Sequence, residues 1–459
     1  MSKRPPPVAD VPDVPDVPKA ADVPSAASAS ASSRVSSALR RQARTAGKPD
    51  TPTDERFSAA NQRPRRLRGW RAARLRFTTG NRLRLFSSGE DYFIALAEKI
   101  DAAREEVLIE TYMFCDDAST RPVSDALKRA AGRGVDVRII TDGIGTARLK
   151  LFDEWAAAGV HHQIYNPHLF GRLGFSRTHR KLAVIDRVIA YVGGINIVCD
   201  LIAGNKHLDE PRWDFALEAV GPVVEDVERA IRTQWRRLDT GYAGRTPWPR
   251  WRRMSAGEAY GTKEAGVAQP QAAFVARDNI SNRGAIEKAY LYAIHRAADE
   301  IVLANPYFVP GRRLRRALMN AAQRGVDVKL LIGRKEFLLL DYAVPSLYSA
   351  LLKAGVKIAE YDKTMLHGKV AVIDRVWATV GSSNLDALSL LVNHEANLVI
   401  VNHAESIALR AAILSAFEES RRIDPAHYVA RPWTERSLNW LAYAFYRTVM
   451  KALTVGRYD

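Results

Sequence analysis

The hydrophobic residues of this chain follow an α/β pattern that begins near residue 88 and runs through twice. Short continuous runs of Val, Ile and Leu, typical of buried strands, alternate with helix-like segments that stop at Gly. The stretch "AAREEVLIETYMF" (102–114) recurs as "HRAADEIVLANPYF" (295–308), and "AAGRGVDVRII" (130–140) recurs as "AAQRGVDVKLL" (321–331). Because strands and helices recur in one order, the pattern predicts an α/β fold of two homologous halves.

The segments outside this repeat differ in composition. Residues 1–60 are rich in Pro, Ala and Ser with few large apolar groups, which predicts a disordered tail. Residues 61–87 alternate Arg with Leu, Trp and Phe, which predicts a basic amphipathic segment, either a solvated helix start or a stretch lying on an anionic surface. The remaining predicted divisions are a first half at 88–241, a Gly/Pro/Arg-rich linker or loop at 242–271, a second half at 272–430 and an amphipathic helix at 431–459.

One stretch recurs with its polar residues unchanged: "THRKLAVIDRVIAYVGGIN" (178–196) and "LHGKVAVIDRVWATVGSSN" (366–384). Each copy has His, Lys and Asp at i, i+2 and i+7, and an Asn 17 residues after the His. On a strand, i and i+2 share a face, so the His and Lys side chains project together. One isolated copy would be read as exposed residues on an amphipathic strand, but two copies at identical spacing favour a shared site. The residues are His179, Lys181, Asp186, Asn196, His367, Lys369, Asp374 and Asn384.

This residue set suits attack on a phosphate diester. One imidazole can attack phosphorus while the other protonates the leaving alkoxide. Ammonium groups and amides can hold the phosphate oxygens, whose charge concentrates in the transition state. The two histidines must begin in opposite protonation states, which an ordinary pKa near 6.5 allows. No cluster of metal ligands accompanies the motif, and we expect neither a metal nor a cofactor.

Charge and cysteine content narrow the class of partner. The formal net charge of +17 predicts attraction to a polyanion or to an anionic surface, so nucleic acid and acidic lipid both qualify. The two cysteines, Cys115 and Cys199, exclude a disulfide framework and a Cys-rich zinc site. The chain starts without the apolar core of a signal peptide and has no run of 18 apolar residues. We therefore expect a cytoplasmic protein that can still lie on a membrane.

The repeated HxKxxxxD, followed by GG or GS and Asn, resembles the motif of the phospholipase D superfamily, and the resemblance covers about residues 80–430. It implies two α/β/α halves packed pseudo-symmetrically around one active site. Further stretches, such as "RGVDVRIITDGIGT" and "GPVVEDVERAIRTQW", are similar to bacterial cardiolipin synthases of the short type without N-terminal membrane spans. This implies transfer of a phosphatidyl group from phosphatidylglycerol, or a similar phospholipid, to phosphatidylglycerol through a phosphohistidine, with release of glycerol.

The resemblance also implies roles for individual residues. His179 would be the nucleophile, and His367 the acid that releases glycerol and then the base on the incoming hydroxyl. Asp214 and Glu395 resemble the family carboxylates that orient the histidines across the interface, Glu395 toward His179 and Asp214 toward His367. The residues implied to bind the phosphate are Lys181, Lys369, Asn196, Asn384 and Ser382.

The motif aspartates Asp186 and Asp374 are included among the catalytic candidates, although their distance along the strand favours structural pairing. A site role for Glu110 would be asymmetric, because its counterpart in the second copy is Ala304.

We expect the partners to be anionic phospholipids and the membrane surface, reached peripherally from the cytoplasmic face, with no nucleic acid. Segments that suit an interface are 63–77, 248–254 and 437–453; the apolar stripe of the last either packs on its own domain or faces lipid. Competing interpretations are a hydrolytic phospholipase D, a phosphodiester nuclease, which the charge would also serve, and a basic binding module without activity.

Overall fold

The computed structural model describes residues 75–146, 149–168, 175–203, 206–240, 270–279, 282–334 and 338–453. The predicted tail (1–60) and nearly all of the predicted linker (242–271) lie outside these residues.

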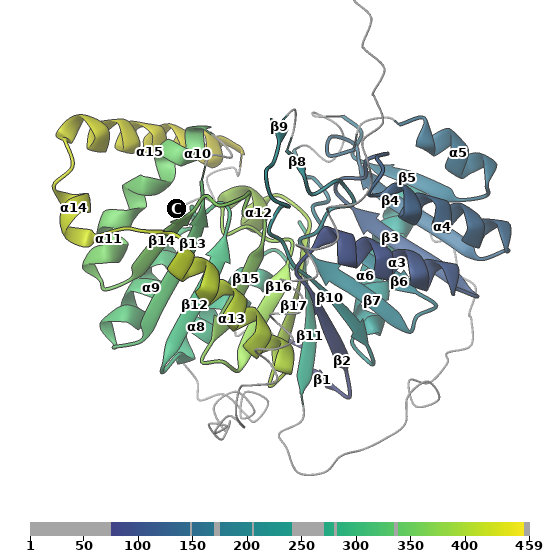
Figure 1. Cartoon of the computed structure of the whole chain (residues 1–459), viewed down its shortest axis with the longest axis horizontal. Helices are drawn as coiled ribbons and strands as arrows, with labels where there is room; N and C mark the ends of the chain where they lie inside the picture. Colours follow the sequence, from purple (N-terminus) through teal and green to yellow (C-terminus); the bar gives the residue numbers. More distant parts are fainter. Residues whose placement is uncertain are drawn as a thin grey trace, which may run out of the picture. The chain divides into compact units, whose positions relative to one another are not determined.

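The first half is built on a seven-stranded sheet (Figure 1). Its strands are β2 (Arg82–Phe86), β3 (Glu106–Thr111), β4 (Asp136–Asp142), β5 (His161–Tyr165), β6 (Leu182–Ile185), β7 (Ile189–Gly193) and β10 (Ala216–Val220). Its helices are α3 (Gly89–Asp101), α4 (Arg121–Gly132), α5 (Leu151–Ala157) and α6 (Val224–Asp239). The strand order is β2-β10-β7-β6-β3-β4-β5, with β3, β4 and β5 parallel and the other neighbours antiparallel. A separate small ribbon pairs β8 (Ile202–Ala203) with β9 (Lys206–His207).

The second half repeats this order in a nine-stranded sheet. Its strands are β1 (Thr78–Thr79), β11 (Gln271–Arg277), β12 (Glu300–Asn305), β13 (Asp327–Gly333), β14 (Lys357–Tyr361), β15 (Lys369–Ile373), β16 (Trp377–Gly381), β17 (Glu395–Val401) and β18 (Arg421–Arg422). Its helices are α8 (Ala285–Arg296), α9 (Arg312–Gln323), α10 (Leu338–Ala343), η2 (Val344–Leu347), α11 (Tyr348–Lys353), α12 (Ala387–Leu391), α13 (Ala404–Glu419), α14 (Pro425–Val429) and α15 (Trp433–Leu453). The series β11-β17-β16-β15-β12-β13-β14 matches the first sheet strand for strand, which confirms the predicted repeat.

Residues 61–74 of the predicted basic amphipathic segment (61–87) lie outside the described residues. The part that the structure describes contains β1 (Thr78–Thr79) and β2. In β2 the side chains alternate, Arg82 and Arg84 outward and Leu83 and Leu85 partly buried, which is the period of an edge strand rather than of a helix. β2 joins the first sheet, whereas β1 pairs with β11 at the edge of the second.

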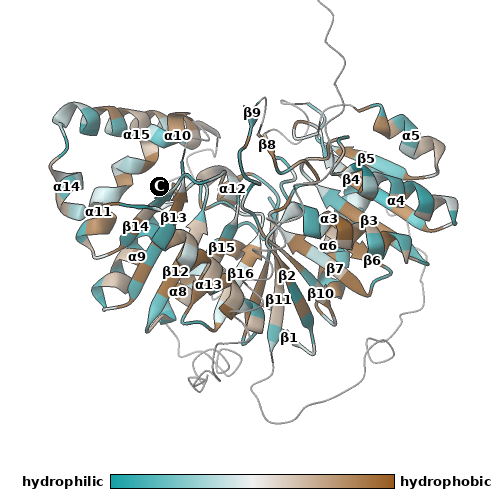
Figure 2. Ribbon diagram, in the orientation of Figure 1, coloured by the Kyte–Doolittle hydropathy of each residue, from teal (hydrophilic) through white to brown (hydrophobic). Residues whose placement is uncertain are grey.

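The two halves share one hydrophobic core between the inner faces of their sheets. That cluster contains Leu108 and Val192 of the first sheet together with Val302 and Leu398 of the second, and it includes residues of α6 and α13. The outer faces are covered separately, the first by α3, α4 and α5 and the second mainly by α8, α9 and α11. Figure 2 shows hydrophobic residues on strands of both sheets and also on the helices that cover them. Within the part of the chain described here, no helix is long and apolar enough to cross a membrane.

Candidate active site

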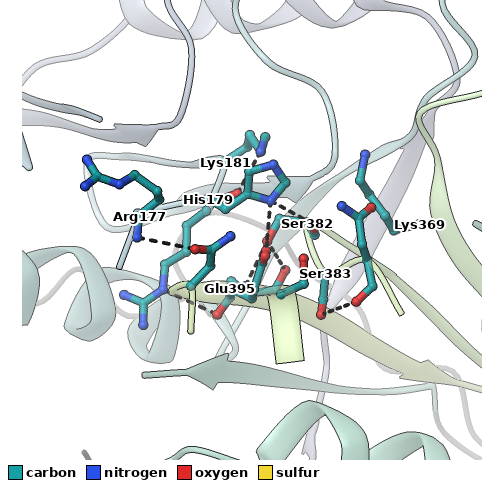
Figure 3. A network of polar contacts seen from close by, with 12 residues as sticks. Arg177, His179, Lys181, Lys369, Ser382, Ser383 and Glu395 are labelled. Carbon is teal, nitrogen blue, oxygen red and sulfur yellow. Dashed lines mark hydrogen bonds and ion pairs between the residues drawn. The ribbon is translucent and has the colours of Figure 1, made fainter. Parts of the chain in front are cut away.

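His179 lies against the second half of the chain. Thr178 and His394 form an isolated parallel bridge, and the backbone N–H of His179 donates to the carbonyl of His394 at 2.9 Å. Glu395 follows His394 at the start of β17, so its carboxylate reaches the imidazole. Nδ1 of His179 lies 3.1 Å from Oε2 of Glu395 and 3.1 Å from the carbonyl oxygen of Ser382 (Figure 3).

His367 lies against the first half in the corresponding way. Trp213 and Leu366 form a parallel bridge, and the N–H of His367 donates to the Trp213 carbonyl at 2.9 Å. Asp214 follows Trp213, and its Oδ2 lies 2.5 Å from Nδ1 of His367. The structure therefore brings each histidine of the repeated motif to a carboxylate supplied by the other half.

Burial shapes the protonation of these two pairs. Each histidine side chain is only 12% exposed, and both carboxylates are more deeply buried. Burial lowers the pKa of His179, and it lowers the pKa of His367 further, with Lys369 adding to the effect. Burial raises the pKa of Asp214 to about 7 against the opposing pull of Lys369. For Glu395 the raising effect of burial is outweighed by the charge and hydrogen bond of His179, so its pKa is lowered. An anion bound beside these imidazoles would favour their protonated forms.

Both motif lysines lie with the histidines. Nζ of Lys181 donates to the carbonyl of His179 at 2.7 Å, and Nζ of Lys369 donates to the carbonyl of His367. Burial lowers the pKa of Lys181 well below its ordinary value, and the nearby charge of Lys369 lowers it further. Because the two ammonium groups repel each other, an anion bound between or beside them would stabilise both.

Asn196 and Asn384 occupy matching positions just after β7 and β16. Both side chains are buried, and among the described residues no group donates a hydrogen bond to either Oδ1 atom. Buried polar atoms without a partner are uncommon in folded proteins. They mark the two amides as candidates for contact with a polar ligand.

Ser382, predicted among the phosphate ligands, has hydrogen-bond partners within the protein. Its hydroxyl donates to Oε2 of Glu395 at 2.5 Å and accepts from the N–H of Ala396 at 3.0 Å. The hydroxyl therefore fixes the carboxylate that faces His179. In the first half the matching residue is Gly194, where an added Cβ would lie 2.2 Å from Oδ1 of Asp214. The carboxylate of Asp214 therefore packs against Gly194, whereas Glu395, which has the longer side chain, is hydrogen-bonded to Ser382.

The structure does not bring Asp186 and Asp374 to the histidines, so their place among the catalytic candidates is corrected. Strand β6 separates His179 from Asp186, and β15 separates His367 from Asp374. Both aspartates have positive φ, 48° and 51°, as has the residue after each, which is the backbone of a type I′ turn. Each carboxylate accepts three backbone N–H groups at 2.8–3.0 Å: those of Arg104, Glu105 and Glu106 for Asp186, and those of Ala298, Asp299 and Glu300 for Asp374.

Tyr112 is a site residue that sequence reasoning missed. Its ring stands edge-on to the imidazole of His179 with centroids 4.9 Å apart, and Nζ of Lys181 lies 5.1 Å from its centroid. Aligning the repeats puts Pro306 opposite Tyr112. This mismatch between two otherwise similar stretches is the signal that could have identified it. The surroundings of the two histidines therefore differ.

Glu110 contacts both neighbours of His179 in the sequence. The hydroxyl of Thr178 donates to its Oε1, and Nη1 of Arg180 lies 3.7 Å from its Oε2. Burial raises the pKa of Glu110 despite Arg180. Since Thr178 and Arg180 flank His179, Glu110 contacts the side chains on both sides of that histidine.

Within the residues that the structure describes, no group of three or more His, Cys, Asp and Glu side chains could hold a metal ion.

Comparison with known proteins places the chain among enzymes of phospholipid synthesis. The family described as "Cardiolipin synthase, PLD-like domain" matches residues 96–207 and 290–419. Cardiolipin synthase B of Escherichia coli K12 is 37% identical over 378 residues, covering 80% of this chain and 88% of that protein. Cardiolipin synthase A of Klebsiella pneumoniae is 31% identical over 380 residues, covering 80% and 75%. The crystal structure of phosphatidylserine synthase from Haemophilus influenzae has a similar fold, with a TM-score of 0.59 at 12% identity, covering 83% of this chain and 97% of that one.

Proposed function

Because the chain belongs to the family of cardiolipin synthases with a PLD-like domain, we propose that it makes cardiolipin by transferring a phosphatidyl group between two phospholipids. One observation supports the proposal: each motif histidine is held at Nδ1 by a carboxylate of the opposite half, and the charges of the two motif lysines act on each other. Duplicated acid/base groups around an anion-binding centre suit a double displacement on a phosphate diester.

In the first displacement, Nε2 of His179 attacks the phosphorus of phosphatidylglycerol. The bond between phosphorus and the glycerol headgroup oxygen breaks, and His367 gives that oxygen its proton, so glycerol leaves and a phosphatidyl-histidine remains. In the second, the neutral His367 takes the proton from the headgroup hydroxyl of another phosphatidylglycerol. That oxygen attacks phosphorus, the bond to His179 breaks, and cardiolipin is released.

The contacts at Nδ1 suit these two roles. A carboxylate that accepts from Nδ1–H fixes the tautomer with a lone pair on Nε2, and it stabilises the imidazolium when Nε2 carries a proton. Glu395 would fix the tautomer of His179 that has its lone pair on Nε2, and Asp214 would stabilise the imidazolium form of His367. Lys181, Lys369, Asn196 and Asn384 would bind the phosphate oxygens. Tyr112 beside His179 would limit the directions from which a substrate can approach that imidazole.

The partners in this proposal are anionic phospholipids at the cytoplasmic face of the membrane, with the protein bound peripherally. The formal charge of +17 supports attraction to such a surface. Nucleic acid is not proposed as a partner.

Product analysis tests the reaction. Purified protein is incubated with vesicles of phosphatidylglycerol, and lipids and glycerol are quantified. Cardiolipin and glycerol in equal amounts are expected, whereas phosphatidic acid in place of cardiolipin would contradict transfer and indicate hydrolysis.

A second measurement tests the two histidine roles. A phosphatidyl donor with a 4-nitrophenol headgroup needs no acid for departure, so H367A should still release one equivalent of nitrophenol and retain a covalent phosphatidyl group. H179A should release none. The reverse pattern would exchange the roles of the two residues.

A further inference from the structure

The C-terminal helix α15 presents two apolar faces, of which the protein covers only one. Tyr446 and Met450 are buried in the core of the second half. Leu438, Leu441 and Phe445, spaced i, i+3 and i+7 on the opposite side, are 50–60% exposed. The sequence left open whether the apolar stripe of this helix packs on its own domain or faces lipid, and in the structure these three residues face outward.

Helix α10 extends the exposed apolar surface. It packs against α15, and its Leu338 is 75% exposed, while Leu339 and Tyr342 are exposed to a smaller extent. Trp433 and Trp440 of α15 are exposed as well. We call this surface, formed by Leu338, Leu339, Tyr342, Trp433, Leu438, Trp440, Leu441 and Phe445, the α10/α15 face. Single exposed apolar residues are ordinary, but eight on two adjacent helices mark an interaction site.

The α10/α15 face lies at the same end of its sheet as the active site. Lys369 begins β15, and the register of β15 with β12, and of β12 with β13, sets it level with Asn305 and Ile332. α10 starts five residues after β13 ends at Gly333. Figure 1 shows α10, α15, β8 and β9 along one edge of the two halves.

The first half adds exposed apolar side chains at its corresponding end. Ile144 follows β4, Ile202 lies in β8, and Phe175 precedes the first motif; all three are exposed. By the register of β3 with β6 and β4, Lys181 is level with Thr111 and Thr141, so Ile144 lies just beyond the lysine. Exposed apolar residues therefore flank the site on both halves.

The composition of the α10/α15 face favours lipid over protein as its partner. The helix α15 carries three basic residues, Arg436, Arg447 and Lys451, and one acidic residue, Glu435. Tryptophan beside basic residues suits the depth of phospholipid headgroups, where the indole ring is apolar and the cation meets phosphate. Figure 2 shows hydrophobic and hydrophilic residues interspersed along α15.

We propose that the α10/α15 face inserts into the surface of an anionic phospholipid bilayer and holds the active site toward the lipid headgroups. This inference rests on the proposed function for its choice of lipid, but it concerns binding and not the chemical step. Insertion would keep the second phospholipid within reach while the first is attached to the enzyme.

The test compares L441E/F445E with I407E, each in the full chain. Ile407 is a matched control, because it is also an exposed apolar residue (48%) but lies on α13, away from α10 and α15. Binding is measured by flotation with vesicles of phosphatidylcholine and phosphatidylglycerol. Since two half-exposed apolar side chains are replaced by charges, L441E/F445E should bind at least about tenfold more weakly, and I407E should bind like the wild type.

Two further readouts keep the outcomes distinct. Nitrophenol release from bis(4-nitrophenyl) phosphate, a soluble diester, should be unchanged in both variants, which separates binding from catalysis. Wild-type binding without lipid turnover would refute the proposed function and leave the docking face intact. Equal vesicle binding by wild type and L441E/F445E would overturn the docking face. If the wild type were a dimer in solution and L441E/F445E a monomer that still bound vesicles, the α10/α15 face would instead be the contact with a second copy of the chain.

Discussion

Replacing Asp214 by Asn tests the division of labour between the two histidines. The Asn side chain can still accept from Nδ1 of His367, so the geometry is kept and one negative charge is removed. The contact is 2.5 Å between Nδ1 and Oδ2, and both groups are buried. Taking the centres of charge about 4 Å apart at an effective dielectric of about 20, the carboxylate stabilises the imidazolium by about 4 kcal/mol. That energy corresponds to roughly a thousandfold in rate.

The assay uses two donors that differ in their need for an acid. With phosphatidylglycerol, whose glycerol must be protonated as it leaves, D214N should be about a thousandfold slower. With the 4-nitrophenol donor, the first-turnover burst should fall by less than about tenfold. The matched variant E395Q should slow both, because attack by His179 is common to the two donors. The assignment of His367 as the acid would be refuted if D214N lost the same factor in rate with both donors. It would also be refuted if D214N kept more than a tenth of the wild-type rate of phosphatidyl transfer from phosphatidylglycerol.

Three other substitutions follow from contacts described above. Gly194→Ser should lower transfer by more than tenfold, because its Cβ would displace the Asp214 carboxylate; a normal rate in a steady-state assay would argue against that contact. Asp186→Asn should lower the free energy of unfolding by about 2 kcal/mol, because a charged acceptor of three backbone N–H groups is lost. Turnover by the folded enzyme should change less than about threefold. Urea titration measures the stability and steady-state kinetics the turnover; a loss of turnover without a loss of stability would return Asp186 to the catalytic candidates. Burial lowers the pKa of His162 to about 4, so this side chain takes up a proton at higher pH in the unfolded chain than in the folded one. The free energy of unfolding should therefore fall by up to about 3 kcal/mol as the pH drops from about 6.5 to 4. Thermal melts at stepped pH should show a flatter pH dependence for His162→Gln, and an unchanged dependence would exclude His162 as its source.

The repeat could be predicted from the sequence because the strands of the two sheets recur in the same order with similar hydrophobic patterns. The Asp214 and Glu395 pairings followed from family resemblance, since nothing in their spacing reveals which histidine each one meets. Contacts that depend on single atoms were not predictable. The bond from Ser382 to Glu395 depends on a backbone path that a hydrophobic pattern does not encode.

The C-terminal helix illustrates a second kind of limit. Periodicity predicted one apolar stripe of Leu438, Leu441, Phe445, Val449 and Ala452, but in the structure Val449 packs on the core while Leu438, Leu441 and Phe445 are exposed. In the structure the opposite side is buried, where Asn439 lies among Tyr446 and Met450. A polar residue inside the packing face weakens its hydrophobic pattern, so the exposed stripe has the clearer signal in the sequence.

Strand β1 and the shared core have a consequence for synthesis of the chain. Thr78 and Thr79 leave the ribosome about 190 residues before their partner β11. Until the second half is complete, Leu108, Val192 and Leu217 on the inner face of the first sheet have no partner from that half. A nascent first half therefore exposes a broad apolar face and an unpaired strand edge, the features that promote aggregation of partly folded chains. The two copies, though alike, are expected to fold as one cooperative unit, so a fragment ending near residue 240 should require the other half, supplied in trans, to remain soluble.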